Sequence, residues 1–149
     1  MSQKFPLVSI IMNCHNGEKY LNDSVKSLLS QTYMNWELIF WDNFSTDNSK
    51  KIIEKFLDKR IKYFKSNNFT SLYQARNLAI EKAKGEYIGF LDIDDLWIED
   101  KLEKQIDFLK KNKEFKIVYS NYYILEDKNN KKYLKYKKPL PSGQITQKL

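Results

Sequence analysis

The sequence has few cysteines, histidines and glycines, and these shortages exclude several kinds of site. The single cysteine, Cys14, cannot form an intrachain disulfide, and a lone thiol is typical of a reducing compartment such as the cytoplasm. The single histidine, His15, cannot build a zinc site with only one cysteine. The four glycines form neither a P-loop nor a GxGxxG dinucleotide motif. A glycine-rich loop that binds phosphates through its backbone amides is therefore excluded.

Long apolar runs are also missing, and arginine is absent where the positive charge is concentrated. No apolar run approaches the roughly 20 residues of a membrane-spanning helix. The net charge of +7 comes from residues 110–138, where ten lysines stand against three acidic residues and no arginine. We expect a solvated basic surface there, or peripheral contact with anionic lipid at the inner face of the membrane. Because no nucleic-acid-binding motif accompanies the lysines, we expect no nucleic-acid partner. The expected location is the cytoplasm.

Apolar runs alternate with amphipathic segments along the chain. The run at residues 7–12 is almost continuous, as in a strand buried on both faces of a parallel sheet. The patterns predict strands at residues 7–12, 36–41, 61–64, 87–91 and 117–125, with helices between them. The predicted fold class is α/β, a Rossmann-like three-layer sandwich with a mainly parallel central sheet.

Polar residues gather where the predicted strands end. The strand-end segments are Asn13-Cys14-His15-Asn16, Asp42-Asn43, Asn67-Asn68 and Asp92-Ile93-Asp94-Asp95. In open α/β sheets, ligands bind beyond the carboxyl ends of the strands. The sequence therefore predicts one polar, partly anionic crevice at this edge of the sheet.

The three carboxylates at residues 92–95 need a partner of positive charge. Bunched carboxylates repel one another and cannot bind phosphate directly, but Mg²⁺ commonly joins one or two carboxylates to substrate phosphates. Asp92-x-Asp94 therefore predicts Mg²⁺ or Mn²⁺ bound together with a diphosphate. Asp95 has an alternative role as the N-cap of the next helix. The same aspartates would also serve a metal-dependent phosphatase or nucleotidyltransferase, and this alternative stays open.

Three segments together resemble a known enzyme family. They are "LVSIIMNCHNGEKYLNDSVKSLLSQTYMNWELIFWDNFSTDNS", "ARNLAIEKAKGEYIGFLDIDDLW" and "IVYSNYYI". In this order, over residues 6–124, they resemble the inverting family 2 nucleotide-sugar glycosyltransferases with the GT-A fold. The resemblance implies transfer of a sugar from a nucleotide diphosphate, usually UDP, to a saccharide or lipid-linked acceptor. Such enzymes commonly build bacterial surface polysaccharides or glycolipids.

The resemblance also implies roles for individual residues. Asp42 matches the aspartate that recognises uracil, and Asp92 and Asp94 match the DxD motif that contacts ribose and metal. The implied nucleotide-sugar-binding residues are Asn13, Cys14, His15, Asp42, Asn68, Arg76 and Asp92, and the implied metal ligands are Asp94 and Asp92.

The family's general base and acceptor-binding elements follow the fifth strand, so the resemblance places the catalytic base beyond Leu149. We therefore expect a nucleotide-sugar-binding GT-A domain at residues 1–125, truncated at its C-terminus, with a lysine-rich extension at residues 126–149. The alternative is a non-catalytic fragment that binds nucleotide-sugar. An incomplete domain would leave a sheet edge or an apolar face uncovered, which favours a homodimer.

Overall fold

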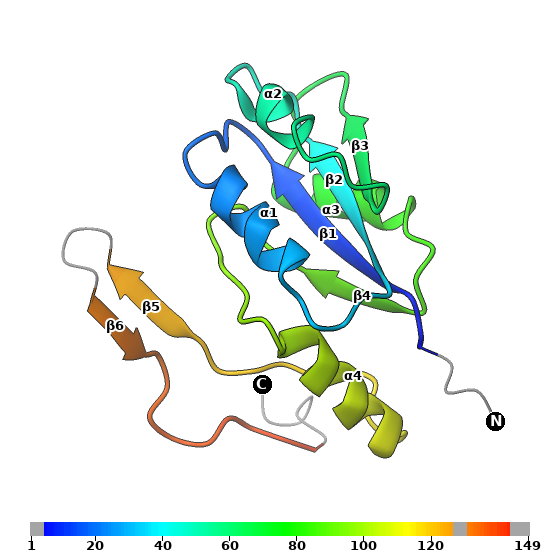
Figure 1. Cartoon of the computed structure of the whole chain (residues 1–149), viewed down its shortest axis with the longest axis vertical. Helices are drawn as coiled ribbons and strands as arrows, with labels where there is room; N and C mark the ends of the chain where they lie inside the picture. The colour runs from blue at the N-terminus through cyan, green and yellow to red at the C-terminus, as the bar shows by residue number, and fades with distance from the viewer. Residues whose placement is uncertain (1–4, 127–130, 144–149) are drawn as a thin grey trace. The chain divides into compact units, whose positions relative to one another are not determined.

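The computed structural model describes residues 5–126 and 131–143. By packing, the chain divides into two compact units, residues 1–103 and residues 104–149. The first unit contains a parallel sheet with three helices, and the second contains most of a fourth helix and a β-hairpin. Figure 1 shows the elements in chain order. The boundary at residue 125, which we expected for a nucleotide-sugar-binding domain, stays a prediction.

The sheet of the first unit has four parallel strands in the order β3-β2-β1-β4. These strands are β1 (Val8–Cys14), β2 (Trp36–Asp42), β3 (Ile61–Lys65) and β4 (Tyr87–Phe90). All of β2 is buried, and so is all of β1 except Asn13, which is partly buried. Both strands are flanked by other strands and covered on both faces, and this burial explains their continuous apolar runs. The sequence prediction of a central parallel sheet is confirmed.

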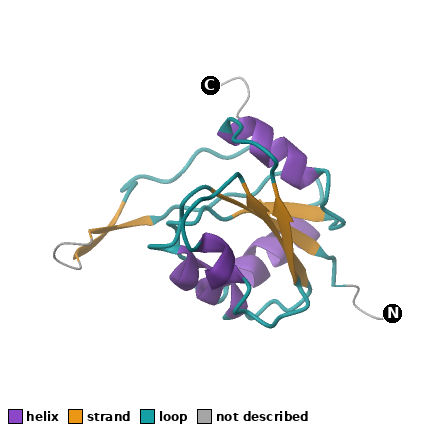
Figure 2. Cartoon of the chain, turned by 90° about the horizontal axis from the view of Figure 1, so that it is seen from above, coloured by secondary structure: helices purple, strands orange, loops and turns teal. Residues whose placement is uncertain are grey.

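Helices cover both faces of this sheet (Figures 1 and 2). They are α1 (Leu21–Leu29), α2 (Ser49–Ile53) and α3 (Leu72–Ile80). A fourth helix, α4 (Lys101–Lys111), begins at the end of the first unit and lies mostly in the second. Ala75 and Ala79 of α3 pack against Ile11, Ile39 and Trp41. Small alanines let the helix lie close to the large side chains of the strands. No helix in the described part of the chain is long and apolar enough to span a bilayer.

The outer strand β4 has an exposed apolar edge. Among the described strands only β1 pairs with it, in the register Val8↔Tyr87 to Ile11↔Phe90. Ile88 is 43% exposed and Phe90 is 49% exposed. Unpaired backbone groups and apolar side chains on one edge strand are typical of a surface that another segment covers.

The predicted fifth strand at residues 117–125 is confirmed only at residues 123–125, and that part belongs to a two-stranded hairpin and not to the parallel sheet. Residues 117–122 lie outside any strand, and β5 (Tyr123–Glu126) pairs antiparallel with β6 (Lys131–Leu134). Apolar alternation favours a strand, but it does not specify the partner of that strand. A hairpin pairs strands that are close in sequence, so closing its loop costs less entropy than pairing with a strand far away along the chain.

Candidate functional site

The loops that follow β1 and β2 are fastened to each other. The backbone N–H of Asn43 donates to the carbonyl of Cys14 at 2.7 Å, and the N–H of Thr46 donates to Asn16 Oδ1 at 2.8 Å. Asn16 and Phe44 have φ angles of 54° and 68°, in the left-handed region that non-glycine residues rarely occupy. The two loops therefore hold one fixed conformation at the carboxyl ends of the central strands.

The segment that follows β4 packs against the loop after β1. Gly17 has no room for a side chain, because an added Cβ would lie 2.5 Å from Ile93 Cδ1 and 2.9 Å from Cys14 Sγ. The hydroxyl of Ser24 on α1 donates to the backbone carbonyl of Asp92 at 3.2 Å. These contacts bring the acidic segment beside the strand-one segment, and the predicted crevice stays a prediction.

Asp42 is buried at the end of β2, and two donors hold its carboxylate. The Tyr63 hydroxyl donates to Oδ2 and the Ser45 N–H donates to Oδ1, both at 2.7 Å. Asp42 is only 1% exposed. Burial raises the pKa of Tyr63, and so do its hydrogen bond to Asp42 and the charge of that residue. The carboxylate is thus fixed in place before any ligand arrives.

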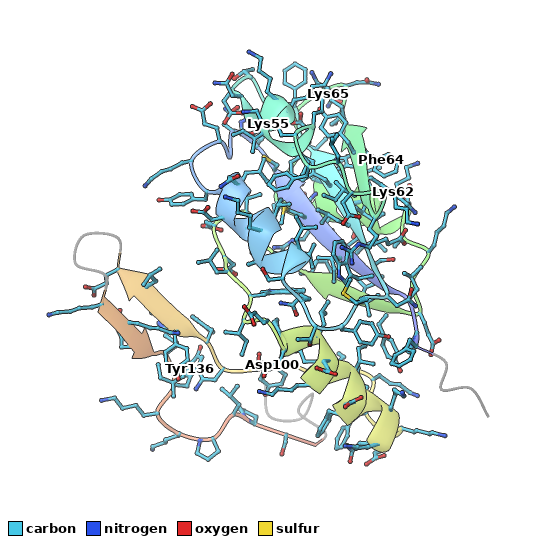
Figure 3. The ribbon with its side chains drawn as sticks, viewed as in Figure 1. Lys55, Lys62, Phe64, Lys65, Asp100 and Tyr136 are labelled. Atoms are coloured by element: carbon cyan, nitrogen blue, oxygen red, sulfur yellow. The ribbon has the colours of Figure 1, made fainter. Side chains whose placement is uncertain are left out.

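Sequence reasoning missed Tyr63. Its ring stacks with that of Phe40, with centroids 5.9 Å apart, and Phe40 and Tyr63 are opposite each other in the β2–β3 register. Side chains alternate along a strand, so Phe40 and Asp42 share a face, and Tyr63 lies on the same face of the neighbouring strand. Only the register of this pair could have identified Tyr63. Lys65, labelled in Figure 3, lies opposite Asp42 and adds a cation at the end of β3.

His15 and Phe69 form an exposed aromatic pair at the same edge. Their ring centroids are 4.6 Å apart, and Phe69 is 58% exposed. Nδ1 of His15 donates to the Asn43 carbonyl at 3.0 Å, since a carbonyl oxygen can only accept. The Asn43 amide donates to the Thr70 carbonyl at 2.8 Å, which ties the Asn68–Phe69 segment to β2. The structure therefore brings His15 and the Asn68 segment together, and it adds Phe69, which the sequence did not indicate.

Asn13 and Cys14 differ in what they offer to a ligand. Asn13 is partly buried, and its Nδ2 has no hydrogen-bond partner in the described part of the chain. An unpaired buried donor costs about 1–3 kcal/mol, so an acceptor on a ligand or a water molecule would be favourable there. The thiol of Cys14 is 1% exposed, and burial raises its pKa although hydrogen bonds with Ser49 and Ser45 oppose this. Asn13 thus holds an unpaired donor, but this nitrogen is buried, as the thiol of Cys14 is.

Arg76 on α3 forms an ion pair with Asp92. Its Nη2 lies 2.7 Å from Asp92 Oδ1, and the guanidinium lies over the Phe90 ring at 5.5 Å. The two side chains are 33% and 50% exposed, so solvent screens the pair and its contribution to stability is small. An exposed guanidinium beside a carboxylate is better suited to meeting a charged ligand than to holding the fold together.

The acidic segment forms a turn and not a helix start. The N–H of Asp95 donates to the Asp92 carbonyl at 3.1 Å, and α4 begins only at Lys101. The prediction that Asp95 caps the next helix is therefore wrong, because five residues separate it from the first helical residue. Burial raises the pKa of Asp95, the charges of Asp94 and Asp92 raise it further, and Lys101 lowers it.

Asp92, Asp94 and Asp95 could supply only some of the ligands that a bound cation needs. In the described residues, no three His, Cys, Asp or Glu side chains converge into a group that could hold a metal. Carboxylate oxygens suit Mg²⁺ and Mn²⁺, and Mg²⁺ typically takes one or two of them together with substrate phosphates. The repulsion that raises the pKa of Asp95 would fall if a cation bound nearby. The donor set thus fits a metal that binds jointly with a diphosphate.

The chain is similar to known glycosyltransferases. WfgD of Escherichia coli, a UDP-Glc:α-D-GlcNAc-diphosphoundecaprenol β-1,3-glucosyltransferase, is 43% identical over 121 residues, which are 81% of this chain and 47% of WfgD. WfaP of Escherichia coli, which carries the same functional name, is 46% identical over 121 residues, 81% of this chain and 48% of WfaP. The chain thus spans about half the length of these curated relatives.

A solved structure supports the same assignment. Staphylococcus aureus TarS in complex with UDP-GlcNAc superposes with a TM-score of 0.69 at 26% identity, over 79% of this chain and 33% of the TarS chain. The predicted GT-A fold is confirmed by this likeness. The sequence model of glycosyl transferase family 2 matches residues 9–148. The chain belongs to glycosyl transferase family 2.

Proposed function

We propose that this chain provides the donor-binding part of an inverting glycosyltransferase that uses a UDP-sugar. The acceptor would be a lipid-linked saccharide in bacterial surface polysaccharide or glycolipid synthesis. Support comes from the family match, from the glucosyltransferase activities for which WfgD and WfaP are named, and from the UDP-GlcNAc complex of TarS. The observation that carries the proposal is the meeting of Asp42, His15 and the Arg76–Asp92 pair at one sheet edge.

The uracil base would bind at Asp42 and beside the aromatic pair. Each carboxylate oxygen has two lone pairs, so Asp42 can accept a further hydrogen bond besides those from Tyr63 and Ser45. Because Asp42 is only 1% exposed, the base would reach it only after the residues that cover it shift on binding. The acidic N–H of uracil is the matching donor. The rings of His15 and Phe69 would supply an aromatic surface on which the base stacks, typically for about 1–3 kcal/mol.

The diphosphate would bind near the acidic turn. Arg76 supplies a fixed positive charge, and Asp92 and Asp94 would be the protein ligands of the metal. A bound Mg²⁺ or Mn²⁺ would supply the positive charge that stabilises the departing diphosphate while an acceptor hydroxyl attacks the sugar in line. The amide of Asn13 would donate to the nucleotide, which would satisfy its unpaired nitrogen.

The test is calorimetric titration of UDP into the 149-residue chain with and without Mn²⁺. We expect Mn²⁺ to lower the Kd at least about tenfold, equivalent to about 1.4 kcal/mol. Asp94→Asn should remove this enhancement, because a neutral amide is a poor ligand for a hard cation. Asp107→Asn is the matched control, since it removes one exposed carboxylate from α4 and should bind like the wild type.

Other outcomes would contradict particular parts of the proposal. A Kd of UDP that changes neither with Mn²⁺ nor with Asp94→Asn would contradict the metal site. The absence of any UDP binding would contradict the nucleotide site. Binding without sugar transfer to any acceptor would favour the non-catalytic fragment. Release of inorganic phosphate from the nucleotide would favour a phosphatase, which the family match does not support.

Homodimerisation and peripheral membrane contact stay predictions. The exposed edge of β4 favours a partner strand, and a second copy of the chain could supply it. Sedimentation velocity at several concentrations would reveal a dimer, and flotation with anionic vesicles would reveal membrane contact.

A further inference from the structure

The second unit contains a hollow of about 620 Å³ that the proposed donor site does not use. One wall comes from the residues that lead into β5, and the other comes from the segment after β6. The lining residues are Tyr119, Ser120, Tyr122, Lys135, Tyr136, Lys137, Lys138, Pro139, Leu140 and Pro141. Figure 3 labels Tyr136 among the side chains of this unit. All ten residues belong to the same compact unit.

Hydrogen bonds fasten the two walls together. The side chain of Asn121 donates through Nδ2 to the Tyr136 carbonyl at 2.7 Å and accepts from the Tyr136 N–H through Oδ1 at 3.3 Å. The Tyr119 hydroxyl donates to the Pro141 carbonyl at 2.5 Å. These side-chain bonds hold the two walls together beyond the paired residues of β5 and β6.

The lining combines positive charge with aromatic rings. It includes three lysines and three tyrosines, and none of these described lining residues is acidic. Tyr119, Tyr122 and Tyr136 are each about half exposed, at 45%, 51% and 46%. Tyr122 and Tyr136 meet edge to face, with ring centroids 6.0 Å apart. The hollow therefore favours an anion that also has a surface able to pack against aromatic rings.

The shape and composition discriminate between classes of anionic ligand. Contact with a flat bilayer does not require a hollow, and inorganic phosphate does not require aromatic rings. Arginine, the preferred residue for bidentate contacts with nucleic acid, is absent from residues 110–138. Small-ligand sites commonly enclose about 300–1,000 Å³ and are lined by aromatic side chains with a few polar groups. A sugar that carries a diphosphate fits each of these observations.

We propose that this hollow binds a sugar diphosphate, with Lys135, Lys137 and Lys138 facing the phosphates and the tyrosine rings packing against the sugar. The inference rests on the proposed function, because the acceptors named for WfgD and WfaP carry GlcNAc on a diphosphate. In this chain, the hollow would hold the phosphorylated end of the acceptor.

The test uses ¹⁵N-labelled chain and a soluble probe, GlcNAc diphosphate esterified to a short alkyl chain. The probe should shift the amide signals of residues 119–122, 135–138 and 140, whereas UDP should shift the amide signals of the loops after β1 and β2. Lys137→Gln/Lys138→Gln should raise the Kd of the probe about tenfold or more, because two charge-assisted contacts are lost. Lys111→Gln/Lys113→Gln removes the same charge from the same unit outside the hollow, and this control should raise the Kd of the probe less than about twofold.

Several outcomes would overturn the inference. Equal weakening by both double variants would mean diffuse attraction to a basic surface. Equal binding of inorganic pyrophosphate would remove the role of the sugar. Equal shifts of the same amides with anionic vesicles or a single-stranded oligonucleotide would assign the surface to a membrane or to nucleic acid. Failure of the probe with UDP binding intact would contradict this inference alone, whereas failure of UDP alone would contradict the donor site alone.

Discussion

At the scale of single residues, Asp42 shows how the fold prepares a charged group for binding. A buried carboxylate is costly unless donors surround it, and here Tyr63 and Ser45 supply them from two different segments. The same hydrogen bonds that stabilise the folded chain also fix the direction of the carboxylate. Stability and the proposed recognition of the base therefore depend on the same atoms.

Tyr63→Phe tests this arrangement. Removing the hydroxyl leaves one oxygen of a buried carboxylate without its donor, so we expect the free energy of unfolding to fall by about 1–3 kcal/mol. The Kd of UDP should rise as well, because the Asp42 carboxylate loses one of the two hydrogen-bond donors that fix its orientation. Urea unfolding and calorimetry would measure the two effects. Tyr73→Phe is the control, since Tyr73 is 75% exposed and the same atom is removed. Equal stability of the two variants would show that Tyr63 does not support Asp42.

At the scale of elements, the sequence predicted all four strands of the parallel sheet, the half-exposed β3 and β4 as well as the buried β1 and β2. β1 and β2 were predictable because covering both faces requires apolar residues at nearly every position. The strand at residues 117–125 was not, because pairing depends on a partner that local pattern does not name. The polar strand ends were predictable because the position of a residue at the end of a strand follows once the strand itself is predicted. Tyr63 and Phe69 were not, since their contacts depend on strand register and on loop conformation.

The junction before β4 shows how closely two elements can be joined. An added Cβ at Gly85 would lie 2.5 Å from the backbone nitrogen of Ser9 and 2.8 Å from the carbonyl oxygen of Leu7. Backbone atoms inside a sheet cannot move aside as the end of a flexible side chain can. The N–H of Gly85 also donates to Ser9 Oγ at 2.8 Å, so this approach is part of the attachment of β4.

Gly85→Ala should therefore displace the start of β4 from β1. We expect a loss of about 1–3 kcal/mol in the free energy of unfolding, the usual cost of overpacking. Urea unfolding followed by tryptophan fluorescence would measure it. Glu86→Ala changes the exposed neighbouring residue and should have little effect. If Gly85→Ala were as stable as Glu86→Ala, the close approach would not constrain the strand.

At the scale of the whole molecule, the sheet depends on one buried carboxylate near the amino ends of its strands. Glu37 on β2 accepts from Ser9 Oγ on β1 at 2.6 Å and from the Lys84 N–H before β4 at 2.7 Å. It also forms an ion pair with Lys62 on β3, labelled in Figure 3. One side chain thus joins all four strand segments. Burial by itself raises the pKa of Glu37, but the hydrogen bonds from Lys62, Ser9 and Lys84 outweigh it, and the net pKa is lowered.

This lowered pKa predicts how the stability of the fold depends on acid. The folded chain binds the proton of Glu37 less readily than the unfolded chain, whose ordinary value is 4.5. The contribution is therefore complete above about pH 4.5 and is lost as the pH falls through the folded pKa below it. Glu37→Gln should be less stable than the wild type at pH 7, by about 1–3 kcal/mol, because a charge-assisted network becomes a neutral one.

The two proteins should also differ in the shape of their acid profiles. Below pH 4.5 the stability of the wild type should fall toward that of Glu37→Gln, so the gap between them should narrow with falling pH. Glu54→Gln is the matched control, because Glu54 pairs with Lys50 at 3.6 Å with both side chains more than half exposed. Its stability should follow the wild type at every pH. Urea unfolding between pH 3 and pH 7 would measure all three chains. A gap for Glu37→Gln that stays constant over this range would show that its effect comes from packing and not from the charge that joins the strands.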